Sequence, residues 1–336
     1  MADILTALSM IFVPLNLLGL VFGVAVGIAF GCMPGLSVNM GLALLFPLAF
    51  SFQGIGGILM LLGIYCGAIY GGSISAILLK TPGTPASVAT TLDGYPMATK
   101  LKQPGRALGL STMASAFGGV FSTICLILLA PQLAKFALQF SKPEYFALAI
   151  FGLSIITSVS SGSVIKGIMG GLFGLFLATV GIDDMSGSIR FTLDTTYLLG
   201  GVSFIPVLIG VFAFAQVLSS IEDYYHSQQS EPIKFIDKVL PSWADIKKVF
   251  VTLVRSSTIG TFIGCVPGTG GDIASFVSYD QAKRWSKNSA NFGNGEPEGV
   301  AAPEAGNNAV SGGAFIPVLT LGIPGDGATA IMMGAL

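Results

Sequence analysis

Charge is scarce in this chain, and so are the residues that most enzymes use for catalysis. Only 10% of its 336 residues are charged, whereas soluble domains average about 25%. The single histidine, His226, lies in a polar stretch, which argues against a Ser-His-Asp or Cys-His catalytic group. The four cysteines form no CxxC motif, so neither a disulfide nor a zinc site is indicated. The net charge of −1 does not suggest a nucleic-acid partner.

Hydrophobic residues, by contrast, make up 52% of the chain. Apolar windows near the length of about 20 residues that crosses a bilayer lie at residues 6–31, 54–79, 107–131, 195–219 and 309–323. Shorter ones lie at residues 38–50, 145–158 and 164–181. The N-terminus carries Asp3 and no basic residue before its apolar run, so we expect this segment to be retained rather than cleaved.

Lysine and arginine near the ends of spans indicate the cytoplasmic side of a membrane. They gather in residues 80–106 and again in the polar stretch 220–248. Four apolar windows separate these stretches. Two loops on the same side of a membrane must be separated by an even number of spans, and four windows meet this condition. The acidic connection at residues 181–194 is then expected on the outer side.

Two motifs recur in the same order along the chain. FGCMPGLSVN at residues 30–39 returns in outline as IGCVPGTGGD at residues 263–272. YGGSISAILLKTPGTPAS at residues 70–87 returns as SGGAFIPVLTLGIPGDGAT at residues 311–329. The basic residues place the two apolar runs in opposite directions across the membrane. Inverted repeats with broken helices are typical of secondary transporters, whose sites lie near the midplane.

These patterns predict an all-α polytopic membrane protein with inverted repeats and broken or re-entrant helices, of the elevator type. The first repeat is expected at residues 1–106 and the intervening transmembrane helices at residues 107–219. A cytoplasmic polar linker follows at residues 220–248, and the second repeat occupies residues 249–336.

The stretch LLKTPGTPASVAT, residues 78–90, shows why a break matters. Pro-Gly stops a helix, and the hydroxyls and free N–H groups at the next helix start attract an anion. The alternative is a tight helix crossing built from small residues. The candidate substrate-binding residues are Ser37, Asn39, Thr81, Gly83, Thr84, Ser87, Thr269, Asn307, Asn308, Thr320 and Gly325.

The second copy also carries acids, unlike the first. Carboxylate and amide oxygens suit a hard cation such as Na⁺, although structural roles are the alternative. A multivalent anion near the midplane needs compensating positive charge, and Lys80 is the one basic residue placed to help directly. We therefore expect Na⁺ as the coupling ion. Its candidate ligands are Asp272, Glu304, Asn307 and Asn308.

Four stretches carry a family resemblance that extends over essentially the whole chain. They are PGLSVNMGLALLFPLAF, GIYCGAIYGGSISAILLKTPGTPASVATTLDGYPMA, VPGTGGDIASFVSYDQAKRWSK and FGNGEPEGVAAPEAGNNAVSGGAFIPVLTLGIPG. The sequence resembles the TctA family, the large membrane subunit of the tripartite tricarboxylate transporters. That resemblance implies a multi-pass carrier of the bacterial inner membrane for citrate-like or other carboxylates. It also implies an ion gradient, usually of Na⁺, a small membrane subunit and a periplasmic solute-binding protein.

Two features depart from what the family leads us to expect. Lys80 stands where asparagine is expected more often, which would alter the preference for substrate charge. The chain ends soon after the second Pro-Gly, so we expect a C-terminally incomplete copy. The competing functions are a membrane channel or a scaffold without coupled transport. An intramembrane enzyme is disfavoured because no nucleophile-base pair is present.

Overall fold

The computed structural model describes residues 2–52, 55–144, 146–147, 150, 163–183, 186–203, 206–207, 210–211, 218 and 237–336. The apolar window at residues 145–158 lies largely outside this part of the chain, as does most of the window at residues 195–219. His226 and the greater part of the expected polar linker lie outside it as well. The two candidate repeats are described almost completely.

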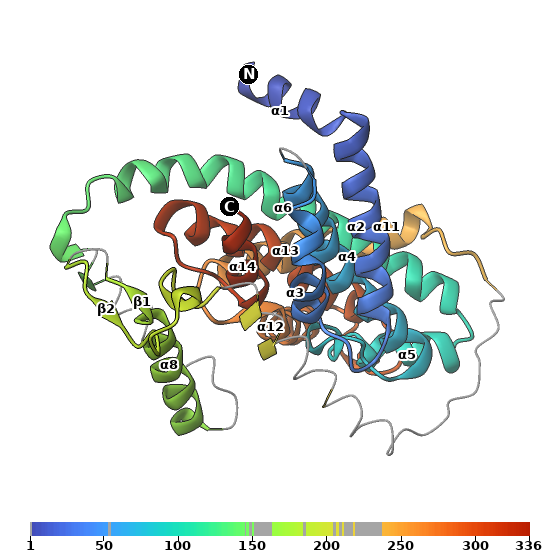
Figure 1. Ribbon diagram of the computed structural model, residues 1–336. Coiled ribbons are helices and arrows are strands. Elements are labelled where there is room, and N and C mark those ends of the chain that lie inside the picture. Colours follow the sequence, from blue (N-terminus) through green and yellow to red (C-terminus); the bar gives the residue numbers. More distant parts are fainter. Residues whose placement is uncertain are drawn as a thin grey trace.

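Helices form nearly all of the described structure (Figure 1). The α-helices are α1 (Ala2–Ile11), α2 (Pro14–Cys32), α3 (Val38–Ala49), α4 (Gly56–Leu79), α5 (Thr91–Thr99), α6 (Pro104–Ala137), α8 (Val164–Ala178), α11 (Trp243–Gly264), α12 (Gly270–Trp285), α13 (Pro297–Leu321) and α14 (Gly327–Met332). The 3₁₀ helices are η1 (Pro85–Ser87), η2 (Thr196–Leu198), η4 (Ser289–Asn291) and η5 (Met333–Ala335). The strands β1 (Gly181–Ile182) and β2 (Ile189–Arg190) form a small antiparallel ribbon, the one described departure from an all-α fold.

Three described helices, α2, α4 and α6, are long and apolar enough to cross a membrane, judged by length and composition. The short windows at residues 38–50 and 164–181 form α3 and α8, as predicted. The window at residues 6–31 is divided between α1 and α2, because the backbone before Pro14 is extended, as proline requires of its predecessor. The window at residues 309–323 is only the second half of α13, whose first half is the buried acidic stretch.

The helices α2, α3 and α4 form a first group, in which α2 and α4 run side by side in the same direction. Gly23 of α2 lies against Met60 of α4, and Gly31 lies against Ala68. A Cβ at either glycine would overlap the α4 backbone, so the approach depends on small residues. Further glycines on the two helices make the same approach: Gly27, Gly63, Gly67 and Gly71.

The helices α11, α12 and α13 form a second group with the same order of parts. Gly260 of α11 lies against Gly306 of α13, and Gly264 lies against Val310, so these two helices also run in one direction. Between them in the chain, α12 packs on both. Each group thus has a first helix, a break, a short second helix, and a long third helix parallel to the first.

The two groups run in opposite directions. Met60 and Tyr65, near the start of α4, share an apolar cluster with Phe315, near the end of α13. Ile77, near the end of α4, shares a second cluster with Val300, near the start of α13. The long helices α4 and α13 are therefore antiparallel, and one apolar cluster lies at each end of the interface between them.

A buried polar layer lies between the two apolar clusters. Its members come from α4, α6 and α13: Ser73, Ser75, Ser111, Ser115, Glu304, Asn307 and Asn308. Polar side chains at membrane depth are costly and mark functional positions more often than structural ones. The layer therefore indicates where the site lies.

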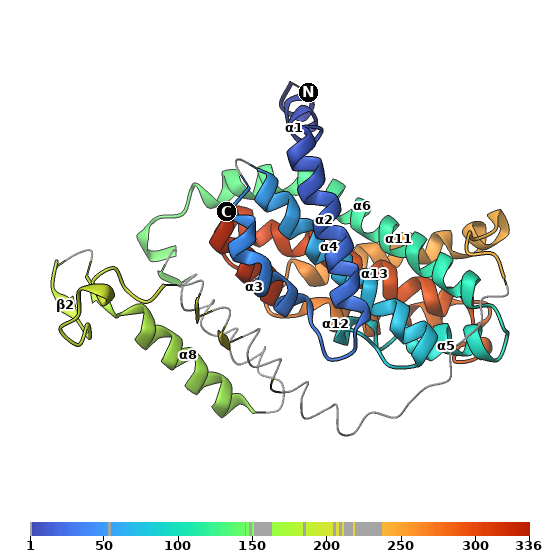
Figure 2. The ribbon, with the colours of Figure 1, turned by 45° about the vertical axis from the view of Figure 1, so that its right-hand side comes forward.

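The remaining helices border this body. The first half of α6 packs along α13, where Gly118 lies against Ala305, and its second half is largely exposed. Beyond the end of α6, α8 and the β1–β2 ribbon stand to one side of the two groups (Figure 2). No residue of α8 is buried.

Candidate functional site

Four interruptions of the helices, the four breaks, define the candidate site. They are residues 33–37 between α2 and α3, 80–84 between α4 and η1, 265–269 between α11 and α12, and 322–326 between α13 and α14. Each break contains a Pro-Gly pair. Proline disfavours helix at the residue before it, so the helices stop at these places, as predicted. Gly35 and Gly268 adopt positive φ, whereas in the other two breaks the positive φ lies at Lys80 and Gly322, two residues before the proline.

Within each group the second break lies against the end of the first helix. A Cβ at Gly83 would overlap the carbonyl oxygen of Gly31. A Cβ at Gly325 would stand 2.8 Å from the carbonyl oxygen of Gly264. The N–H of Gly268 also donates a hydrogen bond of 2.8 Å to the carbonyl oxygen of Gly325. The glycines that correspond in the two motifs thus occupy corresponding places.

Between the groups the contacts are reciprocal. At the start of α14, a Cβ at Gly327 would stand 2.8 Å from Nδ2 of Asn39, in the first turn of α3. At the start of α12, a Cβ at Gly271 would stand 3.3 Å from Cβ of Ala86, in η1. The segment after the second Pro-Gly of each group therefore packs on the second helix of the other group. Through these contacts the four breaks are linked into a ring by α3, η1, α12 and α14, and this arrangement is called the ring of breaks below.

The predicted hydroxyls of the first group serve mainly in packing and capping. Thr84 and Ser87 are buried against Gly72 and share a hydrogen bond of 3.0 Å. Ser37 caps α3 by accepting a hydrogen bond of 3.1 Å from the N–H of Met40. The exposed Thr81 donates to the carbonyl oxygen of Leu79. The helix start after Pro82-Gly83 is a single 3₁₀ turn, η1, and the next α-helix, α5, begins at Thr91.

In the second group, Asn307 is the predicted residue that bonds directly to the first group. Its Nδ2 donates a hydrogen bond of 3.2 Å to the carbonyl oxygen of Ala86. Asn308 supports it by donating a hydrogen bond of 2.6 Å to Oδ1 of Asn307. Thr269 and Thr320 instead donate to carbonyl oxygens of their own group, at 2.6 Å and 2.7 Å.

Glu304 is fully buried in the polar layer and joins three segments. The hydroxyl of Thr90 donates to Oε1 at 2.5 Å, and the hydroxyl of Ser115 on α6 donates to Oε2 at 3.0 Å. None of the ion pairs within the described residues involves Glu304. The sequence did not point to Thr90 and Ser115, because neither belongs to a motif that pairs it with an acid.

The four predicted cation ligands come together only in part. Glu304, Asn307 and Asn308 lie within about one turn of α13, and Asn308 Nδ2 also donates to the Glu304 carbonyl oxygen at 3.0 Å. Asp272 is exposed in the first turn of α12, with Oδ1 2.8 Å from where a Cβ of Gly270 would stand. Gly271, the neighbour of Asp272 in the chain, lies close to Asn307.

Asp326 ties the second group to the first, which sequence analysis did not predict. Its Oδ2 accepts a hydrogen bond of 2.5 Å from the hydroxyl of Tyr65 on α4. The same carboxylate caps α14 through Thr329. The break at residues 322–326 is thus held against α4 as well as against α3.

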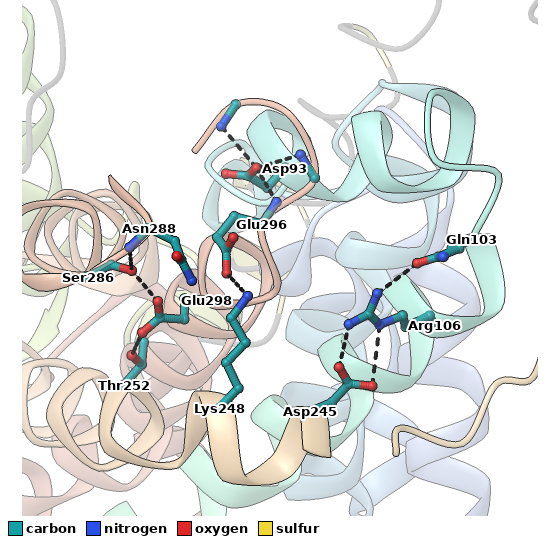
Figure 3. A network of polar contacts seen from close by, with 12 residues as sticks. Asp93, Gln103, Arg106, Asp245, Lys248, Thr252, Ser286, Asn288, Glu296 and Glu298 are labelled. Carbon is teal, nitrogen blue, oxygen red and sulfur yellow. Dashed lines mark hydrogen bonds and ion pairs between the residues drawn. The ribbon is translucent and has the colours of Figure 1, made fainter. Parts of the chain in front are cut away.

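Asp93 makes a second unpredicted connection between the groups (Figure 3). Its fully buried Oδ1 accepts hydrogen bonds of 2.8–2.9 Å from the N–H groups of Gly293, Gly295 and Glu296. Its Oδ2 accepts one of 2.8 Å from the hydroxyl of Tyr279. An acid at this place suits the positive end of the α13 dipole. Asp93, on α5, therefore fixes where α13 begins.

Ion pairs gather at the same end of the molecule (Figure 3). Arg106 pairs with Asp245, and Lys248 pairs with Glu296, both at 2.5 Å. Burial raises the pKa of Asp245, but the hydrogen bonds from Arg106 and Ser242 outweigh it and hold that pKa below its usual value. The described parts of the two lysine-rich stretches, residues 80–106 and 237–248, thus lie at the same end of the molecule. This is the arrangement expected if both stretches are on one side of the membrane.

Comparisons with known proteins agree with the resemblance of the sequence. The family model of the tripartite tricarboxylate transporter TctA family matches residues 17–336. An uncharacterised 52.8 kDa protein in the TAR-I ttuC′ 3′ region of Agrobacterium vitis is 39% identical over 339 residues, which are 100% of this chain and 67% of that protein. An uncharacterised protein in the TAR-II ttuC′ 3′ region of the same organism is 51% identical over 76 residues, 23% of this chain and 31% of that protein. No solved structure matches.

The family match covers nearly the whole chain, including all four breaks. The glycines and prolines that build the ring of breaks lie inside the matched region. The chain therefore belongs to the TctA family of the tripartite tricarboxylate transporters, and it is a component of a transporter rather than an enzyme.

Proposed function

We propose that the chain is the large membrane subunit of a secondary transporter that imports tricarboxylates or related carboxylates across the bacterial inner membrane. The observation that carries this proposal is the ring of breaks, where two antiparallel groups enclose irregular backbone. Such backbone is tolerated at membrane depth only where protein surrounds it or a cavity is present. In secondary transporters, places of this kind hold the substrate.

Recognition of a carboxylate is supported by the helix starts at the ring. Both α3 and α12 begin there, and the free N–H groups at a helix start attract anions. Asn39 adds an amide at the junction with Gly327 of the other group. Because backbone N–H groups recognise carboxylates generically, the ring sets the substrate class rather than one substrate.

Alternating access by an elevator-like motion of inverted repeats is the second part of the proposal. It is supported by the opposite directions of α4 and α13 and by the reciprocal packing of the breaks. The contacts that would change during such a motion are those between the groups, from Asn39 to Gly327 and from Ala86 to Gly271.

Coupling to a cation, with Na⁺ as the carried ion, is the third part. Glu304 supplies a buried negative charge beside the amides of Asn307 and Asn308, and hard cations prefer such oxygens. Asp272 is a further candidate from α12. Bound Na⁺ would offset the charge of a multivalent anion, which is costly at membrane depth without compensation.

The proposed partners follow from family membership. A tripartite system has two further components, for which we propose a small membrane subunit and a periplasmic solute-binding protein. The exposed apolar side chains of α6 and α8 lie outside the two groups, where they are free to meet lipid or the membrane subunit. The substrate is then delivered to the ring of breaks from the periplasmic side.

The proposal is tested by measuring the uptake of a panel of carboxylates by the reconstituted complex. We expect saturable uptake that depends on a cation gradient. Asn39→Ala should weaken substrate affinity by about 1–3 kcal/mol, because a half-buried amide at the junction of the two groups is removed. Asn16→Ala is the matched control, since Asn16 is buried on α2 and bonds to Met10 away from the ring. Uptake that does not saturate would indicate a channel, and absence of uptake in the folded complex would indicate a scaffold.

A further inference from the structure

Arg255 differs from the other arginines of the chain in its partner. The sequence contains four arginines, and all of them lie in the described residues. Three are paired with aspartates: Arg106 with Asp245, Arg190 with Asp183, and Arg284 with Asp280. Arg255 instead lies over the ring of Trp285, with its Cζ 4.2 Å from the ring centroid. Within the described residues its charge therefore has no acidic partner.

Arg255 lies on the outward face of α11. It shares that face with Val251, Thr258 and Phe262, because spacings of three and four residues bring side chains onto one side of a helix. Val251 is 62% exposed and Phe262 is 72% exposed. The guanidinium thus stands on an apolar surface of the kind that faces lipid.

The polar end of the α11–α12 hairpin is close to Arg255. Thr252, three residues earlier on α11, donates a hydrogen bond to Glu298. Ser286, next to Trp285, donates to the same carboxylate. Trp285 itself is 65% exposed, and tryptophan is enriched at the boundary between a bilayer and water. Arg255 therefore lies about one turn from the charged end of the molecule, and the exposed apolar face of α11 continues beyond it to Phe262.

We propose that Arg255 and Trp285 form a binding site for the phosphate of a phospholipid headgroup. A guanidinium offers a phosphate two parallel N–H groups, and the indole ring holds the guanidinium by a cation–π contact. The acyl chains run from Arg255 toward Phe262, away from the charged end of the molecule. Lipid is favoured over a protein acid because the arginine stands where headgroups lie and exposed apolar side chains continue from it.

The lipid should be anionic. Lys283 and Lys287 flank Trp285 in the sequence, and neither forms an ion pair within the described residues. Clustered basic residues beside a membrane attract anionic headgroups. Phosphatidylglycerol is a suitable probe.

Native mass spectrometry of the full-length chain in detergent tests the site. The chain is titrated with phosphatidylglycerol, with diacylglycerol of the same acyl chains, and with glycerol phosphate. We expect retention of phosphatidylglycerol alone. Arg255→Gln should weaken this retention by about tenfold, and Arg255→Lys by less, because lysine keeps the charge without the paired N–H groups. Arg284→Gln is the matched control and should bind as the unaltered chain does.

Two results would overturn the proposal. One is equal retention of phosphatidylglycerol by Arg255→Gln and Arg284→Gln, or equal binding of diacylglycerol. The other is loss of the small membrane subunit from the Arg255→Gln complex with lipid retention unchanged, because the counter-charge would then be an acid of that subunit. Should Arg255→Gln fail to fold, Arg255→Lys and Trp285→Leu provide the same comparison.

Discussion

The α2–α3–α4 group and the α11–α12–α13 group share one arrangement of helices and differ in charge. No acid occurs between Asp3 and Asp93, so the whole first group is free of carboxylates. The second group carries Asp272 at a break and Glu304 in the middle of its long helix. The two groups thus have the same arrangement of helices. The side of the ring formed by the first group is closely packed and carries no carboxylate, whereas the side formed by the second group carries the negative charges.

The break at residues 80–84 in the first group is packed more tightly than the corresponding break at residues 322–326 in the second. A substitution there should therefore have the largest effect on stability. Gly83→Ala should prevent stable folding or cost about 3 kcal/mol or more, because the new Cβ overlaps the carbonyl oxygen of Gly31. Gly325→Ala should cost less, since its Cβ would stand 2.6 Å from Cα of Ala314 and 2.8 Å from the corresponding oxygen of Gly264, against the closer approach at Gly83. The melting temperature and the yield of monodisperse protein measure both.

Gly119→Ala is the control for these substitutions. Gly119 lies on α6 with open space around a new Cβ, so alanine there should be tolerated. A Gly83→Ala protein as stable as Gly119→Ala would show that the break at residues 80–84 does not lie against the end of α2.

Asp93 tests how the two groups are held together, and its effect should be the next largest. Asp93→Ala leaves three N–H groups, two of them buried, and the hydroxyl of Tyr279 without their acceptor, which should cost about 3 kcal/mol. Asp280→Ala removes an exposed acid paired with Arg284 and should cost under about 0.5 kcal/mol. Denaturation of the purified proteins compares them. Equal stability of the two variants would mean that Asp93 does not anchor the start of α13.

Glu304 and Glu298 allow a matched test of the charge on α13. Each accepts hydrogen bonds from two hydroxyls, Glu304 in the polar layer and Glu298 at the charged end. Glu304→Gln should raise the Na⁺ concentration for half-maximal uptake by about tenfold, because the ion loses a carboxylate ligand. Glu298→Gln should leave it unchanged. Uptake that is independent of Na⁺ and collapses with the proton gradient would refute the sodium assignment.

Substitutions of Lys80 and Lys102 should have the smallest effects on stability, and only the substitution of Lys80 should change uptake. Both adopt left-handed backbone, with φ of 58° and 55°, a conformation that asparagine tolerates better than lysine. Lys80→Asn and Lys102→Asn should therefore each raise stability by up to about 1 kcal/mol. Only Lys80→Asn should also weaken uptake of the most highly charged carboxylates, since Lys80 adjoins a break. Equal uptake by the two variants would remove Lys80 from the determinants of substrate charge.

Much of the fold could be predicted from local patterns. The apolar windows at residues 38–50 and 164–181 are helices, and all four Pro-Gly pairs interrupt helices. The roles of single hydroxyls could not be predicted in the same way. Thr84 and Ser87 bond to each other against Gly72, because the segment after the break packs on α4 as well as on α12.

Local sequence was enough to locate the ends of these helices, because Pro-Gly acts on its own neighbours, and it showed two motifs that recur in the same order. Which segments pack against each other, and what each buried acid contacts, depended on the tertiary structure. Glu304 bonds to Thr90 across 214 residues of chain, and Asp93 bonds to Gly295 across 202. Contacts of that kind depend on how closely helices approach and at what level they cross. These quantities are set by the packing of all the helices together and have no local signature.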